Sequence, residues 1–192
     1  LGSDSSAGAG AKDERAGLDH AHDHGHGQEG GAIKQMVLAL VLTWRSTFCL
    51  ARSDAAQPLP FAFGGEADPL AYARAIADGA LLALIASLGL LQLGHETTPE
   101  LAQLTSVSLF LYGMAASTRD GLRAKLAVLI ALPALAASGA PSIALALGVI
   151  GMLVCRFSPT LSDRTFWPWG MASSLLCALI AWWLHAWGWR VS

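Results

Sequence analysis

Charged residues are scarce in this chain and unevenly distributed. Asp, Glu, Lys and Arg make up 14% of the 192 residues, whereas soluble proteins average about 25%. Hydrophobic residues make up 54%, the mean hydropathy is +0.48, and long blocks in the second half carry no charge. This composition predicts an integral membrane protein with one polar extension.

Motifs that carry chemistry are also lacking. The sequence contains no HExxH, no GxSxG, no nucleotide-binding loop and no pair of histidines within an apolar run that would hold a haem. The three cysteines, Cys49, Cys155 and Cys177, form no CxxC and are predicted to be free thiols. A net charge of -2 gives no reason to expect nucleic acid. We therefore expect neither an enzyme nor a nucleic-acid-binding protein.

The polar extension covers residues 1–32, and residues 33–192 form the predicted membrane domain. Residues 1–31 contain no aromatic or β-branched residue, so on their own they cannot bury enough apolar surface to offset the entropy cost of ordering. A flexible tail is predicted. The chain begins at Leu1 without an initiator Met, which fits a mature chain after removal of a signal peptide better than a fragment.

Six apolar runs follow the tail. An all-α bundle of about six transmembrane helices is predicted, with spans at 33–50, 75–94, 101–117, 126–137, 143–154 and 165–189. The fourth and fifth runs are short, so they are either thin spanning helices or a re-entrant hairpin. Both versions return the chain to the same side. Segment 53–69, with its prolines and glycines, is predicted to be a loop.

Three kinds of residue within the runs predict helix contacts. Small residues in the fifth run permit close approach of helices, namely Ala144, Ala146, Gly148 and Gly151. Hydroxyls in the third run can bond to their own helix or to a neighbour, namely Thr105, Ser106 and Ser108. Tryptophans gather toward the two ends of the sixth run, as in an aromatic belt, at positions 167, 169, 182, 183, 187 and 189.

Loop charges predict the orientation. Seven cationic residues fall on one side of the six crossings: Arg52, Arg74, Arg119, Arg123, Lys125, Arg156 and Arg164. The turns at His95 and Gly139 on the other side carry none. The positive-inside rule therefore predicts that the seven-charge side is cytoplasmic and that both termini face outward or into a lumen. The side of the tail depends on 33–50 crossing the membrane.

The tail carries four histidines on alternate residues, His20, His22, His24 and His26, with Asp23 between them. Imidazole nitrogen is a good ligand for Zn²⁺, Ni²⁺, Co²⁺ and Cu²⁺, so weak, poorly selective binding of a divalent transition metal is predicted. A polar tail without metal, or a pH-sensing tail, is the alternative. No other cofactor is expected.

Three further residues are predicted to share the tail's side of the membrane and extend the metal site. They are His95, Glu96 and His185. The simpler interpretation is a solvated helix cap for the first two and an interfacial histidine for the third.

Two ionisable residues fall inside apolar runs, Arg45 in the first and Asp78 in the second. A charge at membrane depth is costly, which makes such residues functional candidates. Pairing with each other would give both a structural role, whereas a role in transport or gating is the alternative.

Two functional hypotheses remain. The first is a non-catalytic accessory or structural subunit of a larger membrane complex, with the lipid bilayer and other membrane subunits as partners. The second is a divalent-metal transport or homeostasis protein that captures ions with the histidine tail. An enzyme is third.

Overall fold

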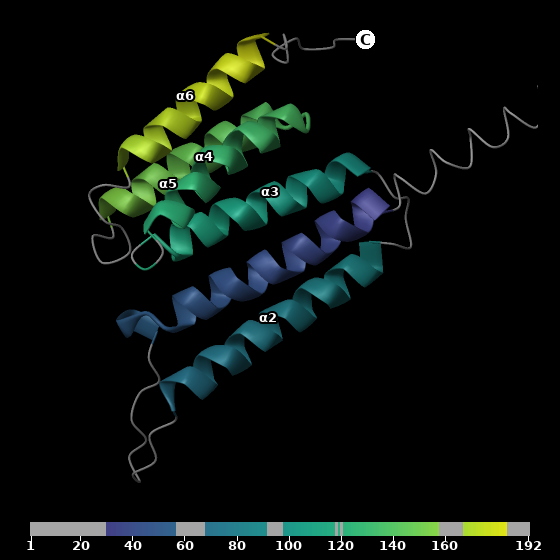
Figure 1. Cartoon of the computed structure of the whole chain (residues 1–192), viewed down its shortest axis with the longest axis vertical. Helices are drawn as coiled ribbons and strands as arrows, with labels where there is room; N and C mark the ends of the chain where they lie inside the picture. The colour runs from purple at the N-terminus through teal and green to yellow at the C-terminus, as the bar shows by residue number, and fades with distance from the viewer. Residues whose placement is uncertain are drawn as a thin grey trace, which may run out of the picture.

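The chain is built from α-helices. The computed structural model describes residues 30–56, 68–91, 98–117, 119, 121–157 and 167–183, and within these ranges it contains no strand. The helices are the first helix (Gly30–Ala51), which carries no label in Figure 1, α2 (Pro69–Leu91), α3 (Thr98–Ala115), α4 (Gly121–Ala137), α5 (Pro141–Phe157) and α6 (Trp167–Trp183), and the 3-10 turn η1 covers Asp54–Ala56. The predicted all-α class is confirmed.

Several helices extend beyond the apolar runs. α2 begins six residues before the predicted span, because Asp68 Oδ1 accepts a hydrogen bond from the Leu70 amide at 3.2 Å and Pro69 suits the first helical position. α4 begins at Gly121, so that Arg123 and Lys125 lie within it. α4 and α5 each have 17 residues, as α6 does. α4 and α5 are therefore longer than the runs that predicted them, whereas α6 is shorter than the run at 165–189.

A tight turn joins α4 to α5. Gly139 has a φ of 94°, its amide donates to Ala136 O at 3.2 Å, and the Ala140 amide donates to Leu135 O at 3.3 Å. These two bonds form a Schellman motif, which satisfies carbonyls at the helix end and favours glycine at the left-handed position. Pro141 then opens α5, so the two helices form an antiparallel hairpin.

The helices alternate in direction, and in Figure 1 they form a row from α2 through the first helix to α3, which ends in a cluster of α4, α5 and α6. α4 packs against α3, α5 and α6, and α5 also packs against α6. We call α3–α6 the bundle. The first helix lies beside α3 and α2 lies beyond it, at the edge of the row; we call these two the edge pair.

One end of the row holds most of the described cations, and we call it the basic end. It holds the ends of the first helix, α3 and α5 and the beginnings of α2, α4 and α6. Its described cations are Arg52, Arg74, Arg119, Arg123, Lys125 and Arg156, and its described acids are Asp54 and Asp68. The other end has Lys34 and Glu100. The alternation of the helices thus places the predicted charge asymmetry at one end of the structure.

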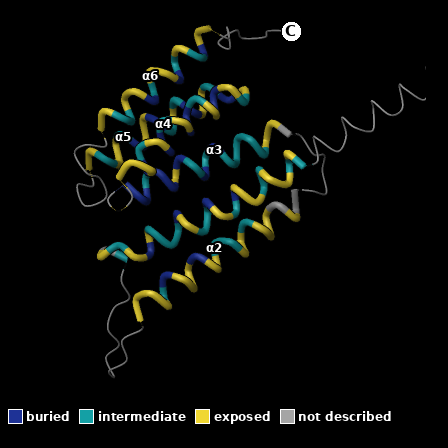
Figure 2. Tube along the Cα trace, viewed as in Figure 1, coloured by how far each residue is buried: buried dark blue, intermediate teal, exposed yellow. Residues whose placement is uncertain are grey.

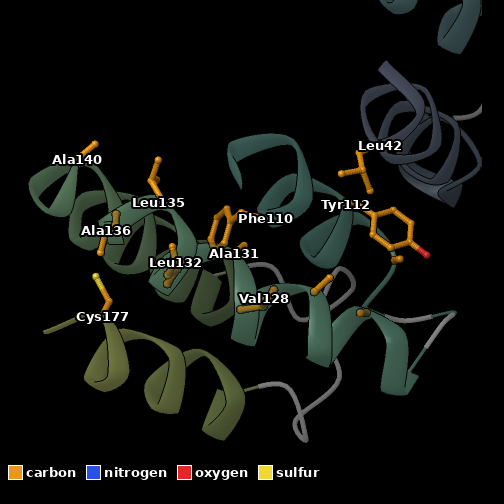
Figure 3. Packing of buried hydrophobic residues seen from close by; sticks show 14 residues of the cluster. Leu42, Phe110, Tyr112, Val128, Ala131, Leu132, Leu135, Ala136, Ala140 and Cys177 are labelled. Carbon is orange, nitrogen blue, oxygen red and sulfur yellow. The ribbon is translucent and has the colours of Figure 1, made fainter. Parts of the chain in front are cut away.

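The interior consists mainly of small residues. Among the residues that the structure describes, 20 hydrophobic residues are buried and 13 of them are alanines. Figure 3 shows larger ones, such as Leu132 and Phe110, packed among them. Large apolar residues are exposed instead, including Leu82 (67% exposed) and Leu179 (65%), and Figure 2 shows exposed positions along α2 and α6.

Glycines let the bundle helices approach closely. A Cβ on Gly113 of α3 would lie 2.6 Å from Val128 Cγ2 and 2.9 Å from the Ala124 carbonyl oxygen of α4. A Cβ on Gly148 would lie 2.8 Å from Ser174 Oγ, and one on Gly151 would lie 2.6 Å from Phe110 Cζ. The predicted small-residue contacts of α5 are confirmed for its glycines and for Ala144, whereas Ala146 is exposed.

Two described helices are long and apolar enough to cross a membrane, the first helix and residues 69–87 of α2. α5 is a shorter apolar helix. Only 17% and 11% of the apolar windows of the two long helices are buried. A core helix of a soluble protein would be mostly buried, so these two helices differ from one in the surface that they expose.

Candidate functional site: a polar seam on the first helix

Polar side chains lie where the first helix contacts α2 and where it contacts α3. We call this set the polar seam; its members are Thr43, Trp44, Arg45, Asp78, Thr105, Ser108 and Tyr112. It includes both ionisable residues that the sequence placed within apolar runs. Because it contains both of these residues, the polar seam is the candidate functional site.

Asp78 is held by an indole. Trp44 Nε1 donates a hydrogen bond to Asp78 Oδ1 at 2.8 Å, which joins the first helix to α2. The Trp44 ring also stacks on Phe48, with ring centroids 5.1 Å apart. Asp78 is the tenth residue of α2 and its side chain is exposed, so one indole N–H leaves most of the hydrogen-bonding capacity of the carboxylate unused.

Arg45 faces a different neighbour. Its guanidinium carbon lies 5.9 Å from the centroid of the Tyr112 ring on α3, within the range of a cation–π contact. Consecutive helical residues point about 100° apart, so Trp44 is directed toward α2 and Arg45 toward α3. Within the described chain Arg45 and Asp78 form no ion pair with each other, so the pairing that we considered is not seen, and each contacts an aromatic side chain of a neighbouring helix.

Hydroxyl groups complete the boundary with α3. Thr43 Oγ1 and Ser108 Oγ lie 3.3 Å apart, and Thr105 Oγ1 donates to the Gln35 carbonyl at 3.1 Å. Thr105 also donates to Leu101 O of its own helix at 2.7 Å, as Ser106 does to Ala102 O. The third run was predicted to use its hydroxyls in both ways, and this is confirmed.

At the basic end, Arg119 bonds to the backbone at the end of the first helix. An Arg119 guanidinium nitrogen lies 2.6 Å from the Arg52 carbonyl oxygen, just after the end of the first helix. The last carbonyls of a helix have no partner within it and carry partial negative charge, so a cation placed there is favourable. Arg119 therefore holds the first helix to the turn that follows α3.

A separate polar contact lies inside the bundle. Pro133 in α4 has no amide hydrogen to donate, so the carbonyl four residues earlier, at Leu129, loses its usual partner. The fully buried Ser173 of α6 donates to the neighbouring Val128 carbonyl at 2.7 Å and lies 3.4 Å from the Leu129 oxygen. The hydroxyl thus supplies a donor at the proline, as neighbouring helices do in membrane proteins.

The predicted metal ligands lie outside the described residues. This applies to His20, His22, Asp23, His24 and His26 of the tail, and to the predicted additions His95, Glu96 and His185. In the part of the chain that the structure describes, no three His, Cys, Asp or Glu side chains gather to hold an ion. The metal site stays a prediction.

A small hollow between the bundle helices is the other candidate. Met114, Met152, Cys155 and Trp167 contribute to its wall, and Gly148 and Gly151 also line it. The residues that line it are apolar or weakly polar, so they offer a ligand no charge and little hydrogen bonding. The polar seam carries the stronger chemistry.

Some residues of the seam were not singled out from the sequence. Trp44 and Tyr112 contact the two charges, but nothing in their spacing shows which helix each faces. The signal available was the position of Trp44 beside a charge within an apolar run. No protein family model, curated protein or solved structure matches this chain.

Proposed function

We propose that this chain is a polytopic integral membrane protein of about six spans that serves as a non-catalytic accessory or structural subunit of a larger membrane complex. One observation carries the membrane part of this proposal. The structure buries alanine and glycine between its helices and turns large apolar side chains outward. Water would oppose that distribution, whereas lipid favours small residues at helix contacts and bulky apolar residues around them.

The lengths of the shorter helices fit the same proposal. A helix of 17 residues is about 25 Å long, which is close to the thickness of a bilayer's hydrocarbon core, about 30 Å. Tryptophans stand at both ends of α6, and Trp167, Trp182 and Trp183 are exposed. Exposed indoles at the two ends of a helix suit the two headgroup regions.

The basic end is proposed to face the cytoplasm. Six described cations against two acids gather there, compared with one of each sign at the opposite end. The positive-inside rule then places the start of the first helix and the end of α6 on the non-cytoplasmic side, together with the histidine tail.

A structural role is supported by how the polar groups are used. Ser106, Ser173 and Thr105 donate to backbone carbonyls, and Trp44 donates to Asp78. Gln103 of α3 donates to the Ser138 carbonyl in the α4–α5 turn at 3.2 Å. Apart from Ser106, which bonds within α3, these groups join one helix to another or to a turn, so most of these polar contacts serve assembly of the fold.

Metal capture is the second candidate, and the alternating histidines of the tail favour it. In this version the tail gathers or buffers a divalent ion on the non-cytoplasmic side. It acts beside the membrane domain and needs no path through the helices.

Gentle purification in detergent separates the two candidates. We expect the chain to stay in the membrane when membranes are washed at alkaline pH. In detergent, it should co-purify with other membrane proteins in fixed stoichiometry. Bound metal is measured in the natural chain and in a variant with His20, His22, His24 and His26 changed to Ala. A lone chain that moves Zn²⁺ or Ni²⁺ into liposomes would contradict the subunit role, and a chain released by alkaline extraction would contradict the membrane role.

A further inference from the structure

We propose that the edge pair is a dimerisation surface, on which Arg45 of each copy pairs with Asp78 of a second copy of this chain. This inference rests on the proposed membrane function and names one partner within it. Its starting point is that two opposite charges at membrane depth lie on neighbouring helices, both exposed, without pairing within the chain.

The two charges lie near one level of the row. Trp44, which directly precedes Arg45, reaches Asp78 with its indole at 2.8 Å. Arg45 is six residues from the end of the first helix, and Asp78 is nine residues from the start of α2, so both lie about 9–14 Å inside the basic end. The difference is about one helical turn, which a long arginine side chain can span.

The similar depth of Arg45 and Asp78 matters because of the symmetry that a membrane dimer needs. Two copies with the same orientation in a bilayer are related by a twofold axis along the membrane normal, and this axis leaves the depth of every residue unchanged. Reciprocal contacts can then form only between residues of similar depth. Arg45 and Asp78 meet that condition, and one twofold interface pairs both charges of each copy.

Charge favours a second copy over an unrelated helix. The surface carries one cation and one anion, so its complement is a surface with the same two charges, which this chain itself supplies. The surroundings are apolar and exposed, with Val37 and Val41 on the first helix and Leu82 and Ile85 on α2. An unpaired charge among such residues in lipid is unfavourable, and an opposite charge on a partner relieves it.

The test measures energy transfer between two fluorescently tagged populations of the full chain in phosphatidylcholine vesicles, over a range of dilution in lipid. We expect the natural chain to dimerise. Arg45→Gln and Asp78→Asn are each expected to raise the dissociation constant about tenfold. Asn keeps an acceptor for Trp44, so the contact within the chain is retained. Lys34→Gln removes a charge from the other end of the first helix and should leave dimerisation unchanged.

Mixing the two variants guards against simple misfolding. A pair made of one Arg45→Gln copy and one Asp78→Asn copy keeps a single Arg45–Asp78 contact, whereas neither variant paired with itself keeps any. Mixed dimers should therefore exceed the statistical share, which a folding defect does not produce. A statistical share of mixed dimers would overturn the proposal.

Two other outcomes also overturn it, and both leave the membrane proposal standing. One is an alkali-resistant membrane protein that stays monomeric at every dilution, alone or with an unrelated stoichiometric partner. The other is dimerisation that both charge variants leave unchanged. Release of the chain by alkaline extraction would instead count against the proposed function itself.

Discussion

The bundle and the edge pair are held together by different physical means. In the bundle, helices approach through glycine and alanine, with Gly113 against the backbone of α4 and Gly148 against Ser174 of α6. The buried cluster draws almost all of its members from α3–α6, and the first helix contributes Leu42. The edge pair also buries alanines, Ala39, Ala73 and Ala77, but none of its described glycines makes such a contact, and the polar seam and the bond from Arg119 to the Arg52 carbonyl attach it.

The two regions therefore differ in how many contacts hold them, because the bundle has many small ones and the edge pair depends on a few polar side chains. Close packing of small residues gains many dispersion contacts at once, and no single group carries them. A seam of a few hydrogen bonds depends on a few side chains, each of modest net value. The edge pair also exposes the longest apolar helices, so it is the part best suited to meet another protein.

The largest effect is expected from a methyl group added inside the bundle. Gly113→Ala would place a Cβ 2.6 Å from Val128 Cγ2 and 2.9 Å from the Ala124 carbonyl oxygen, and overpacking of this kind costs about 1–3 kcal/mol. Gly79→Ala in α2 is the matched control, because nothing lies within 4 Å of its Cβ position. It should gain up to about 1 kcal/mol from helix propensity.

Thermal unfolding followed by helical circular dichroism in detergent gives both values. The Gly113→Ala midpoint should fall and the Gly79→Ala midpoint should hold or rise. Equal effects at the two glycines would remove the distinction between bundle and edge pair.

The next effect concerns the proline of α4. Ser173→Ala removes the buried donor to the Val128 carbonyl and should lower the free energy of unfolding by about 1 kcal/mol. Ser87→Ala removes a hydroxyl that bonds Leu84 O of its own helix at an exposed site, so its effect should be close to zero. A Ser173→Ala protein as stable as the natural chain would show that the carbonyls near Pro133 need no donor from α6.

A smaller and local effect is expected between the first helix and α2. Trp44→Phe keeps a ring to stack on Phe48 but removes the 2.8 Å hydrogen bond to Asp78, worth about 0.5–1.5 kcal/mol. Amide hydrogen exchange should therefore speed up by about tenfold or less in α2 and stay unchanged in α4. Faster exchange throughout α4 would mean that the edge pair and the bundle unfold as one unit.

Much of the helix layout could be predicted from the sequence, because each described helix contains an apolar run that polar or turn-forming residues separate from the next. The ends of the helices were harder to predict from the sequence. α4 continues through Arg123 and Lys125, which an apolar count omits, and α2 begins where Asp68 caps it. Polar residues at the ends of a helix are part of it, although they contribute nothing to hydropathy.

Only part of the polar seam could be predicted from the sequence. Arg45 and Asp78 were found because charges stand out in apolar runs, but their partners depend on how each helix is rotated about its axis. The first helix touches neighbours on two sides, so Trp44 and Arg45 contact different helices although they are adjacent. A single apolar run contains little periodic signal for that rotation. The histidine site stays a prediction, since its residues lie outside the described ranges.

The smallest effect tests whether the seam is as weak as its geometry indicates. Thr43 and Ser108 lie 3.3 Å apart, a long distance for two hydroxyls. A double-mutant cycle with Thr43→Val and Ser108→Ala, read from unfolding in detergent, should give a coupling of about 0.6 kcal/mol, the average between membrane helices. The value is small because hydroxyls in a helix can also bond to their own backbone, as Ser46 and Thr47 do with the Thr43 carbonyl. A coupling above about 2 kcal/mol would exceed what such contacts supply, and the edge pair would then be fixed as firmly as the bundle.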